Sequence, residues 1–216
     1  MSTKTETGSN KSAFIWIGIG VVVVVGLFVW AIASGGATSG NADFEVPAFG
    51  EIDVAGALAP LDPSSAGVAE FDPAAGQPAP VAIGTDYNGV ASSVGDSGEP
   101  QIIVFLAHWC SFCQAEVPDL VTAMAGGSTI DGVEVVGVAT ASNSTRGNYP
   151  PASWLEAEGW TGGVLMDDAQ SSVLVAYGLG SFPAWAAVQA DGTVAGRATG
   201  ALSEEQVSQW AALAQG

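Results

Sequence analysis

Two largely apolar runs limit the folds open to this chain more than any other feature. Residues 101–106 read QIIVFL and residues 133–139 read VEVVGVA. Continuous runs of β-branched and aromatic residues are typical of strands that are buried on both faces of a sheet. Between them, residues 110–125 have the composition of a helix that ends at Gly126 and Gly127. The order strand, helix, strand predicts an α/β domain.

The rest of the C-terminal half continues this alternation. We expect helices over residues 151–158, 169–178 and 203–214. We expect strands over residues 164–166, 184–188 and 193–198. Asp191 and Gly192 are typical of a hairpin turn between the last two strands. Ser203 and Gln206 fit a capping box at the start of the last helix. The pattern predicts one domain with helices on both faces of a mixed β-sheet.

Both cysteines of the chain lie where the first predicted strand meets the first predicted helix. Residues 108–113 read HWCSFC, so Cys110 opens the helix and Cys113 lies one turn further along. Unpaired backbone N–H groups and the positive end of the helix dipole favour a thiolate at a helix N-terminus. Cys110 is therefore expected to be the exposed nucleophile, and Cys113 the thiol that resolves a mixed disulfide. The spacing predicts a redox dithiol.

Other uses of the two cysteines fit less well. A structural zinc site needs four ligands, and the chain has two Cys and one His. A C-x-x-C-H haem site would need histidine where the chain has Gln114. A structural disulfide remains an alternative outside the cell, but a loop of two intervening residues removes little chain entropy. The sequence therefore predicts no metal, haem or other cofactor.

The residues around the cysteines resemble a known family. Residues 109–118 read WCSFCQAEVP, which resembles the W-C-x-x-C-x-x-E-x-P motif of the TlpA/ResA-type branch of the thioredoxin superfamily, whose members are membrane-anchored and extracytoplasmic. The resemblance runs over residues 76–214. Within it, residues 180–183 (GSFP) and the turn at 191–192 resemble the cis-proline loop and hairpin of that branch. This resemblance implies a thioredoxin-like fold and thiol–disulfide exchange on protein cysteines.

The resemblance also implies roles for individual residues. Pro183 would be a cis-proline beside the disulfide and, with Phe182, would present backbone to an extended substrate strand. Trp109 would shield the thiolate. Glu116 would lie near Cys113 beneath the active site and shuttle a proton during exchange, with a pKa raised by burial.

Three positions near the cysteines leave questions open. Cytoplasmic thioredoxins carry a buried aspartate where this chain has Val104, so any proton relay falls to Glu116. The dipeptide at 111–112 (SF) is neither the Gly-Pro of thioredoxin nor the Pro-His of strong periplasmic oxidants, so the sequence does not predict a reductase or an oxidase. His108 is either a cation that favours the Cys110 thiolate or a neutral turn residue.

The N-terminal region predicts a membrane anchor. Residues 13–34 read AFIWIGIGVVVVVGLFVWAIAS and carry no charge. At about 1.5 Å per residue, a helix of this length would cross a hydrocarbon core of about 30 Å. Lys4 and Lys11 precede the run, so the positive-inside rule places residues 1–12 in the cytoplasm and the rest outside. A cleaved signal ending at Ala31-Ile32-Ala33 is the alternative to this signal-anchor.

Composition excludes two classes of partner. The formal net charge is −18, and such a surface repels nucleic acid and anionic lipid head groups. Residues 35–75 are rich in Gly, Ala, Pro and acidic residues, which predicts a flexible linker before a domain at 76–216. Short apolar pieces of this linker, such as residues 52–61, are candidates for docking on the domain.

We therefore expect a single-pass cell-membrane protein whose extracytoplasmic thioredoxin-like domain exchanges disulfides with protein thiols. A membrane redox carrier would reset the dithiol. The alternative is a non-catalytic thioredoxin scaffold that binds envelope proteins at the groove beside Phe182 and Pro183. A thioredoxin-fold peroxidase would need the motif P-x-x-x-[ST]-x-x-C, which the chain lacks. The client proteins, the reduction potential and the oligomeric state do not follow from the sequence.

Overall fold

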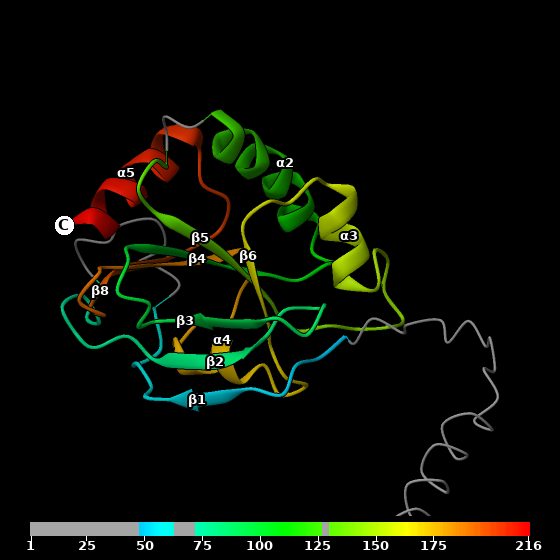
Figure 1. Cartoon of the computed structure of the whole chain (residues 1–216), viewed down its shortest axis with the longest axis horizontal. Coiled ribbons are helices and arrows are strands. Elements are labelled where there is room, and N and C mark those ends of the chain that lie inside the picture. Colours follow the sequence, from blue (N-terminus) through cyan, green and yellow to red (C-terminus); the bar gives the residue numbers. More distant parts are fainter. Residues whose placement is uncertain (1–47, 63–71, 127–129) are drawn as a thin grey trace, which may run out of the picture. The chain divides into compact units, whose positions relative to one another are not determined.

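A five-stranded mixed sheet lies at the centre of the computed structural model, which describes residues 48–62, 72–126 and 130–216 (Figure 1). The strand order is β6-β5-β4-β7-β8. β4, β5 and β6 are parallel, whereas β7 is antiparallel to β4 and β8 is antiparallel to β7. In chain order from β4, the strands are Gln101–Leu106, Glu134–Ala139, Gly163–Met166, Ala184–Val188 and Val194–Thr199.

One face of this sheet is covered by three helices (Figure 1). They are α2 (Ser111–Gly126), α3 (Pro151–Ala157) and α5 (Glu204–Gln215). Ile102 and Val104 of β4 point to this face because alternate residues of a strand face opposite sides. Every residue of β4 is buried, as expected for a central strand with both faces covered.

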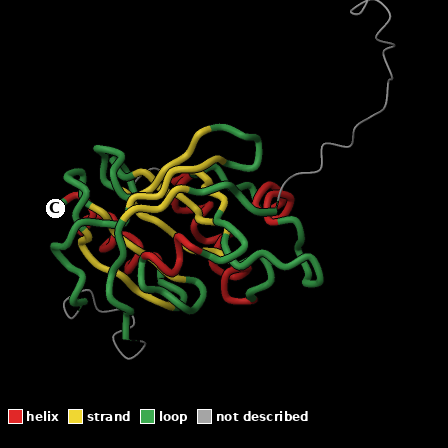
Figure 2. The backbone as a smooth tube through the Cα atoms, turned by 90° about the horizontal axis from the view of Figure 1, so that it is seen from below, coloured by secondary structure: helices red, strands yellow, loops and turns green. Residues whose placement is uncertain are grey.

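The opposite face is covered by a helix and a second sheet. The helix is α4 (Ser172–Ala176). The sheet is antiparallel, with the order β1-β2-β3, and its strands are Asp53–Ala55, Val81–Thr85 and Ala91–Val94. Ile103 and Phe105 of β4 pack on this side. Figure 2 shows the same arrangement from below, with strands in yellow and helices in red.

The expected α/β fold with helices on both faces of a mixed sheet is confirmed, with two differences. The strands β1, β2 and β3 were not predicted. The helix expected over residues 169–178 is shorter, because Asp168 accepts the backbone N–H groups of Gln170 and Ser172, both at 3.0 Å, and forms a turn before α4.

The folded unit begins earlier than residue 76, the boundary expected from composition. β1 pairs with β2, and Leu58 and Leu61 lie in the core on the side of α4. The N–H of Leu58 donates to the carbonyl of Ala176, and that of Leu61 to the carbonyl of Gly178, each at 2.8 Å. Pro60 lies between these two leucines and interrupts regular structure, but both hydrogen bonds form. Residues 35–47 and 63–71 of the expected linker lie outside the described residues.

A buried ion pair joins this N-terminal segment to the sheet. Arg197 of β8 donates from Nη2 to Asp72 at 2.7 Å and from Nε at 3.0 Å, and both side chains are fully buried. Arg197 Nη1 also donates to the carbonyl oxygens of Ala59 and Tyr177. Burial raises the pKa of Asp72, but hydrogen bonds from Arg197 and Ala74 outweigh it and lower the pKa overall. One guanidinium therefore ties three separate segments together.

The expected anchor at 13–34 and the expected cytoplasmic residues 1–12 lie outside the described residues. None of the helices in the part that the structure describes has the length and apolar composition needed to cross a membrane. The anchor therefore stays a prediction.

Candidate active site

The two cysteines lie where β4 passes into α2. The N–H of Cys110 donates to the carbonyl of Ala107 at 2.9 Å, and the N–H of Gln114 donates to the carbonyl of Cys110 at 3.0 Å. Cys110 thus precedes Ser111, the first residue of α2, and Cys113 is inside the first turn. Both cysteines are free thiols. The position at the helix start that the sequence predicted for Cys110 is confirmed.

Both cysteines are buried, so the exposure expected for Cys110 is not found, but the two thiols differ in how deeply they are buried. Cys110 is 8% exposed and Cys113 is 0% exposed. Burial raises the pKa of Cys113; a backbone hydrogen bond with Ala107 partly offsets this effect, and Cys110 and Glu116 add to it. Cys113 is therefore protonated at neutral pH in the reduced protein. An incoming disulfide can reach only Cys110.

The loop before β7 lies against Cys110. The Phe182–Pro183 peptide bond is cis, as the resemblance implied. Because β7 pairs with β4, with Ala184 opposite Phe105, the loop is brought to the end of β4 where α2 begins. The Sγ of Cys110 lies 3.7 Å from the carbonyl oxygen of Phe182, a residue 72 positions away in the sequence. Pro183 has no backbone N–H, so it adds no hydrogen-bond donor to this part of the loop.

The side chain of Trp109, the residue before Cys110, makes three contacts. Its ring meets the ring of Phe182 edge to face, with centroids 5.8 Å apart. Its Nε1–H donates to the carbonyl of Ala141 at 2.8 Å. The guanidinium carbon of Arg146 lies over the same ring, 4.9 Å from its centroid. Trp109 is therefore held in place from three directions, next to Cys110 in the chain.

His108 is a neutral structural residue, which resolves the choice left open by the sequence. It is 1% exposed. Its Nδ1–H donates to the carbonyl of Gly147 at 2.7 Å, and its Nε2 accepts the N–H of Asn143 at 3.0 Å. One donor and one acceptor fit the neutral imidazole. Burial lowers the pKa of His108, and the hydrogen bond to Gly147 offsets this only in part. The ring holds the 143–147 loop and supplies no charge to Cys110.

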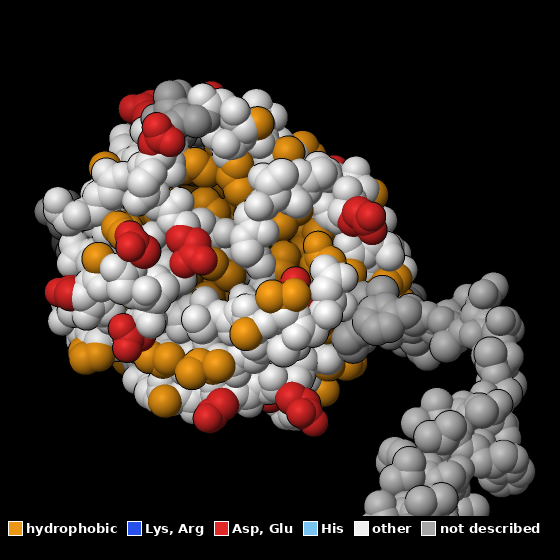
Figure 3. All heavy atoms as spheres, in the orientation of Figure 1, with side chains coloured by type: hydrophobic (Ala, Val, Ile, Leu, Met, Phe, Trp, Pro, Cys, Tyr) orange, Lys and Arg blue, Asp and Glu red, His pale blue; other side chains and the backbone are white. Residues whose placement is uncertain are grey.

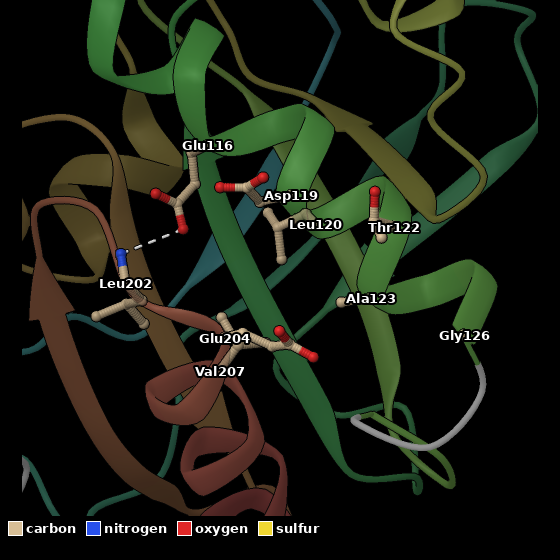
Figure 4. A pocket seen from close by; sticks show the side chains of 9 residues that line it. All are labelled: Glu116, Asp119, Leu120, Thr122, Ala123, Gly126, Leu202, Glu204 and Val207. Atoms are coloured by element: carbon tan, nitrogen blue, oxygen red, sulfur yellow. Dashed lines mark hydrogen bonds between the residues drawn. The ribbon is translucent and has the colours of Figure 1, made fainter.

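Glu116 is buried one turn beyond Cys113 on α2. It is 4% exposed, and its Oε1 accepts the N–H of Leu202 at 3.2 Å (Figure 4). Burial raises its pKa to about 7; the hydrogen bond from Leu202 lowers the pKa, and the charge of Asp119 raises it further. The raised pKa expected for Glu116 is therefore found, with the expected cause.

A cavity of about 330 Å³ between α2 and α5 gives water access to this carboxyl group. Figure 4 shows Glu116 and Asp119 on the α2 side and Leu202, Glu204 and Val207 on the α5 side. The cavity joins a buried carboxyl group to the solvent, so Glu116 can exchange its proton with water without passing through Cys110.

The loop of residues 140–149 contributes to the site although its sequence did not predict this role. The loop follows β5, the strand beside β4, and it supplies Ala141, Asn143, Arg146 and Gly147 to the contacts described above. Tyr149 adds an edge-to-face contact with His108, with centroids 5.7 Å apart. The predicted order of strands could have indicated this loop. The ends of neighbouring parallel strands meet at the same edge of a sheet, so the loop after β5 lies near the cysteines that follow β4.

Three features define a thioredoxin-like thiol–disulfide oxidoreductase. They are a mixed sheet, two thiols at the start of the helix that follows its central strand, and a cis-proline loop against the outer thiol. The family comparison agrees with this class. The model of the Redoxin family matches residues 74–213, and the chain belongs to that family.

Solved structures show the same fold. A thiol:disulfide interchange protein of the thioredoxin family from Chlorobium tepidum TLS is 24% identical, with a TM-score of 0.54 over 64% of this chain and 96% of that chain. A putative DsbE from Chlorobium tepidum is 20% identical, with a TM-score of 0.54 over 66% and 98%. StoA from Bacillus subtilis is 20% identical, with a TM-score of 0.51 over 64% and 98%. A search of curated proteins found no match.

Proposed function

We propose that this protein exchanges disulfides with protein cysteines through Cys110 and Cys113. The unequal access of the two thiols carries this proposal: Cys110 is 8% exposed beside the cis-proline loop, and Cys113 is 0% exposed one turn behind it. This inequality gives the reaction an order, because a client can bond only to Cys110 and only Cys113 is left to release it.

In the reducing direction, the thiolate of Cys110 attacks one sulfur of a client disulfide. A Cys110–client disulfide forms and the other client sulfur leaves as a thiolate. The thiolate of Cys113 then attacks the Sγ of Cys110, which releases the second client thiol and leaves a Cys110–Cys113 disulfide. Two electrons pass to the client, and the same steps in reverse oxidise a client dithiol.

Glu116 supplies the proton transfer that the second step needs. Cys113 has a raised pKa, so it has to lose a proton before it attacks. Glu116 lies one turn away on the same helix and has a pKa of about 7, so it can accept that proton near neutral pH. The cavity between α2 and α5 lets the proton pass on to water.

Trp109, Phe182 and Pro183 form the client-binding edge of the site. Pro183 offers no N–H, and the carbonyl of Phe182 faces Cys110. An extended client segment can therefore lie along this loop with its cysteine beside Cys110, as an added strand does at the edge of a sheet.

We further propose that the protein is of the TlpA/ResA type, anchored in the cell membrane by residues 13–34 with its domain outside the cytoplasm. The charge-free run after Lys4 and Lys11 and the motif over residues 109–118 support this proposal. Its partners are then extracytoplasmic protein thiols or disulfides and a membrane carrier that resets the dithiol.

Reduction of insulin disulfides by dithiothreitol, followed as turbidity, tests the activity. The wild-type protein is expected to accelerate the reaction, and Cys110→Ser and Cys113→Ser variants are expected to lose the acceleration. Equal turbidity curves with and without wild-type protein would instead support a non-catalytic scaffold. The reduction potential of the pair then gives the direction, on a scale from about −270 mV for thioredoxin to about −120 mV for DsbA.

A further inference from the structure

The loop of residues 140–149 is fixed to the two residues that precede Cys110. His108 makes two of the contacts, with Gly147 at 2.7 Å and Asn143 at 3.0 Å. Trp109 makes the third, from its Nε1–H to the carbonyl of Ala141 at 2.8 Å. The loop is therefore part of the wall of the active site, held by hydrogen bonds at both of its ends.

Within this loop, Arg146 is placed by a tight turn. Its N–H donates to the carbonyl of Asn143 at 3.1 Å. The side chain of Asn143 closes the turn by accepting from the N–H of Thr145 at 3.0 Å and from its hydroxyl at 2.8 Å. The exposed guanidinium then lies over the ring of Trp109, 4.9 Å from the centroid. A guanidinium stacked on an aromatic face keeps its edge N–H groups free to donate.

The charge of Arg146 is unusual for this molecule. The formal net charge is −18. In the described ranges Arg197 is the other basic residue, and it is fully buried against Asp72. On the face drawn in Figure 3, acidic side chains are scattered and no Lys or Arg of the described residues is visible. Arg146 is thus the one exposed Lys or Arg side chain among the described residues, and it lies over the ring of Trp109, the residue that precedes Cys110.

Other aromatic residues contact the residues before Cys110 or lie next to the cysteines in the chain. Phe112, between the two cysteines, is 66% exposed, and Tyr149 of the loop is 41% exposed. Trp109 and Phe182 are partly exposed and contact each other. We call Trp109, Phe112, Arg146, Tyr149 and Phe182 the docking surface. It combines apolar area with a single cation on a molecule that is otherwise acidic.

We propose that this docking surface selects client segments that carry an acidic side chain next to the reacting cysteine, with Arg146 binding the carboxylate. The inference rests on the proposed function. Acidic residues dominate the rest of the described surface and repel an acidic segment, so among the described residues Arg146 is the exposed cation that attracts it. Attraction there brings the client cysteine toward Cys110. A basic segment has many acidic places to bind, and most of them are unproductive.

Peptides of one sequence that differ at one position test this proposal. Each carries a cysteine blocked as a neutral thiopyridyl disulfide, preceded by Glu, Gln or Lys, and the rate of attack by the reduced full-length protein is followed by thiopyridone release. The Glu peptide is expected to react about fivefold faster than the Gln peptide, the upper range for an exposed ion pair. This preference is expected to shrink between about 50 mM and about 500 mM NaCl.

Variants separate client selection from other effects of charge. In Arg146→Gln the ratio of the Glu rate to the Gln rate is expected to fall to about one, and Arg146→Lys is expected to keep part of it. Gln209→Glu on the exposed side of α5 changes the net charge by the same amount and is expected to keep the ratio. The rate of alkylation by iodoacetamide, which is neutral and small, reports the reactivity of Cys110 alone.

Two outcomes would overturn the inference while the proposed function stands. One is an unchanged Glu/Gln ratio in Arg146→Gln. The other is an equal loss of rate toward all three peptides and iodoacetamide, which would assign Arg146 to the Cys110 thiolate and not to the client. If no peptide reacts although iodoacetamide labels Cys110, the proposed function itself fails and the inference falls with it.

Discussion

Cys110 and Cys113 are separated by one helical turn, yet they lie in different environments. Cys110 stands at the open end of α2 beside the carbonyl of Phe182. Cys113 points into the core between β4 and α2, where burial raises its pKa. The two side chains are chemically identical, so their difference in burial comes from their places on α2. These places assign the attacking role to Cys110 and the resolving role to Cys113.

Limited alkylation of the reduced protein tests this assignment. With substoichiometric iodoacetamide at about pH 6, we expect the label to be found mainly on Cys110, because Cys113 is 0% exposed and protonated. Peptide mapping by mass spectrometry gives the ratio of the two labelled sites. A denatured sample, in which both thiols are accessible, serves as the control. Preferential labelling of Cys113 in the folded protein would contradict the assignment of the two roles.

Glu116 links the site to pH. Its pKa is about 7 in the fold, against an ordinary value of 4.5. Between these values the folded protein keeps a proton that the unfolded chain releases, so the free energy of unfolding falls as pH rises through this range and then levels off. The stabilisation is thus complete below about pH 4.5 and lost above about pH 7, a change of up to about 3 kcal/mol.

Replacing Glu116 with Gln removes this titration and still leaves an oxygen to accept the N–H of Leu202. We expect urea unfolding of Glu116→Gln to lack the loss of stability that wild type shows between about pH 5 and about pH 8. We also expect resolution of mixed disulfides at about pH 7 to slow by tenfold or more, because the general base is gone. Stopped-flow decay of a preformed mixed disulfide measures this step.

The exposed neighbour Asp119 provides a matched control for this prediction. Asp119→Asn removes a carboxylate from the same helix and the same cavity, and it is expected to slow resolution little. Equal rates and equal pH profiles for wild type and Glu116→Gln would show that Glu116 is only a buried helix residue with no part in proton transfer.

At this scale the sequence predicted what local spacing controls. The placement of Cys110 at a helix start and of Glu116 one turn beyond Cys113 follows from the motif itself. The neutrality of His108 and the position of Arg146 over Trp109 do not follow, because their partners come from a loop more than 30 positions away. Contacts of that kind depend on which strand ends meet in the folded sheet.

Among the elements, the strands and helices after residue 100 were predictable because each has a strong apolar pattern or a terminal signal. The capping box of Ser203 and Gln206, for example, is formed in full. The strands β1, β2 and β3 were missed because they are short, and only parts of them are buried. β1 pairs with β2 over a long separation, with Ala55 opposite Val81, which no local pattern reveals. β2 and β3 form a local hairpin, and the Asn88-Gly89 pair in its turn is a signal that was overlooked.

The pair of Asp72 and Arg197 is the element-scale contact most open to test. Asp72→Asn leaves the guanidinium buried without its counter-charge, and we expect a loss of about 3–5 kcal/mol in the free energy of unfolding. Because the pKa of Asp72 is lowered from 3.8, the stabilisation is present above that value and is lost as pH falls through the lower pKa of the fold. Urea unfolding at about pH 7 measures the loss.

Asp131→Asn is the control for this change, because Asp131 is exposed and its charge is removed without breaking a buried pair. We expect it to alter stability by less than about 0.5 kcal/mol. If Asp72→Asn were as stable as Asp131→Asn, the pair of Asp72 and Arg197 would contribute little to holding the N-terminal segment against β8.

For the whole molecule, the acidic composition bears on the membrane anchoring that we propose. A domain of net negative charge is repelled by anionic lipid head groups, so the proposed attachment would have to come from the chain itself. Residues 13–34 would supply it, and the segment before β1 would let the domain reach clients away from the membrane.

Protease added to intact cells or protoplasts tests this topology. We expect the domain to be degraded from outside while a cytoplasmic marker protein survives, because the positive charges of Lys4 and Lys11 keep the N-terminus inside. We also expect the protein to remain with the membrane fraction. Finding the domain free in the medium with Ser34 at its N-terminus would show cleavage and contradict the anchor.

The most direct test of the central claim is to trap the intermediate of exchange. Cys113→Ser removes the resolving thiol, so the disulfide between Cys110 and a client should persist. Cells that express this variant are quenched with acid, and its adducts are separated on non-reducing gels and mapped by mass spectrometry. The account predicts client adducts through Cys110 that dithiothreitol releases, and none in Cys110→Ser. Equal adducts in both variants, or none in either, would contradict it.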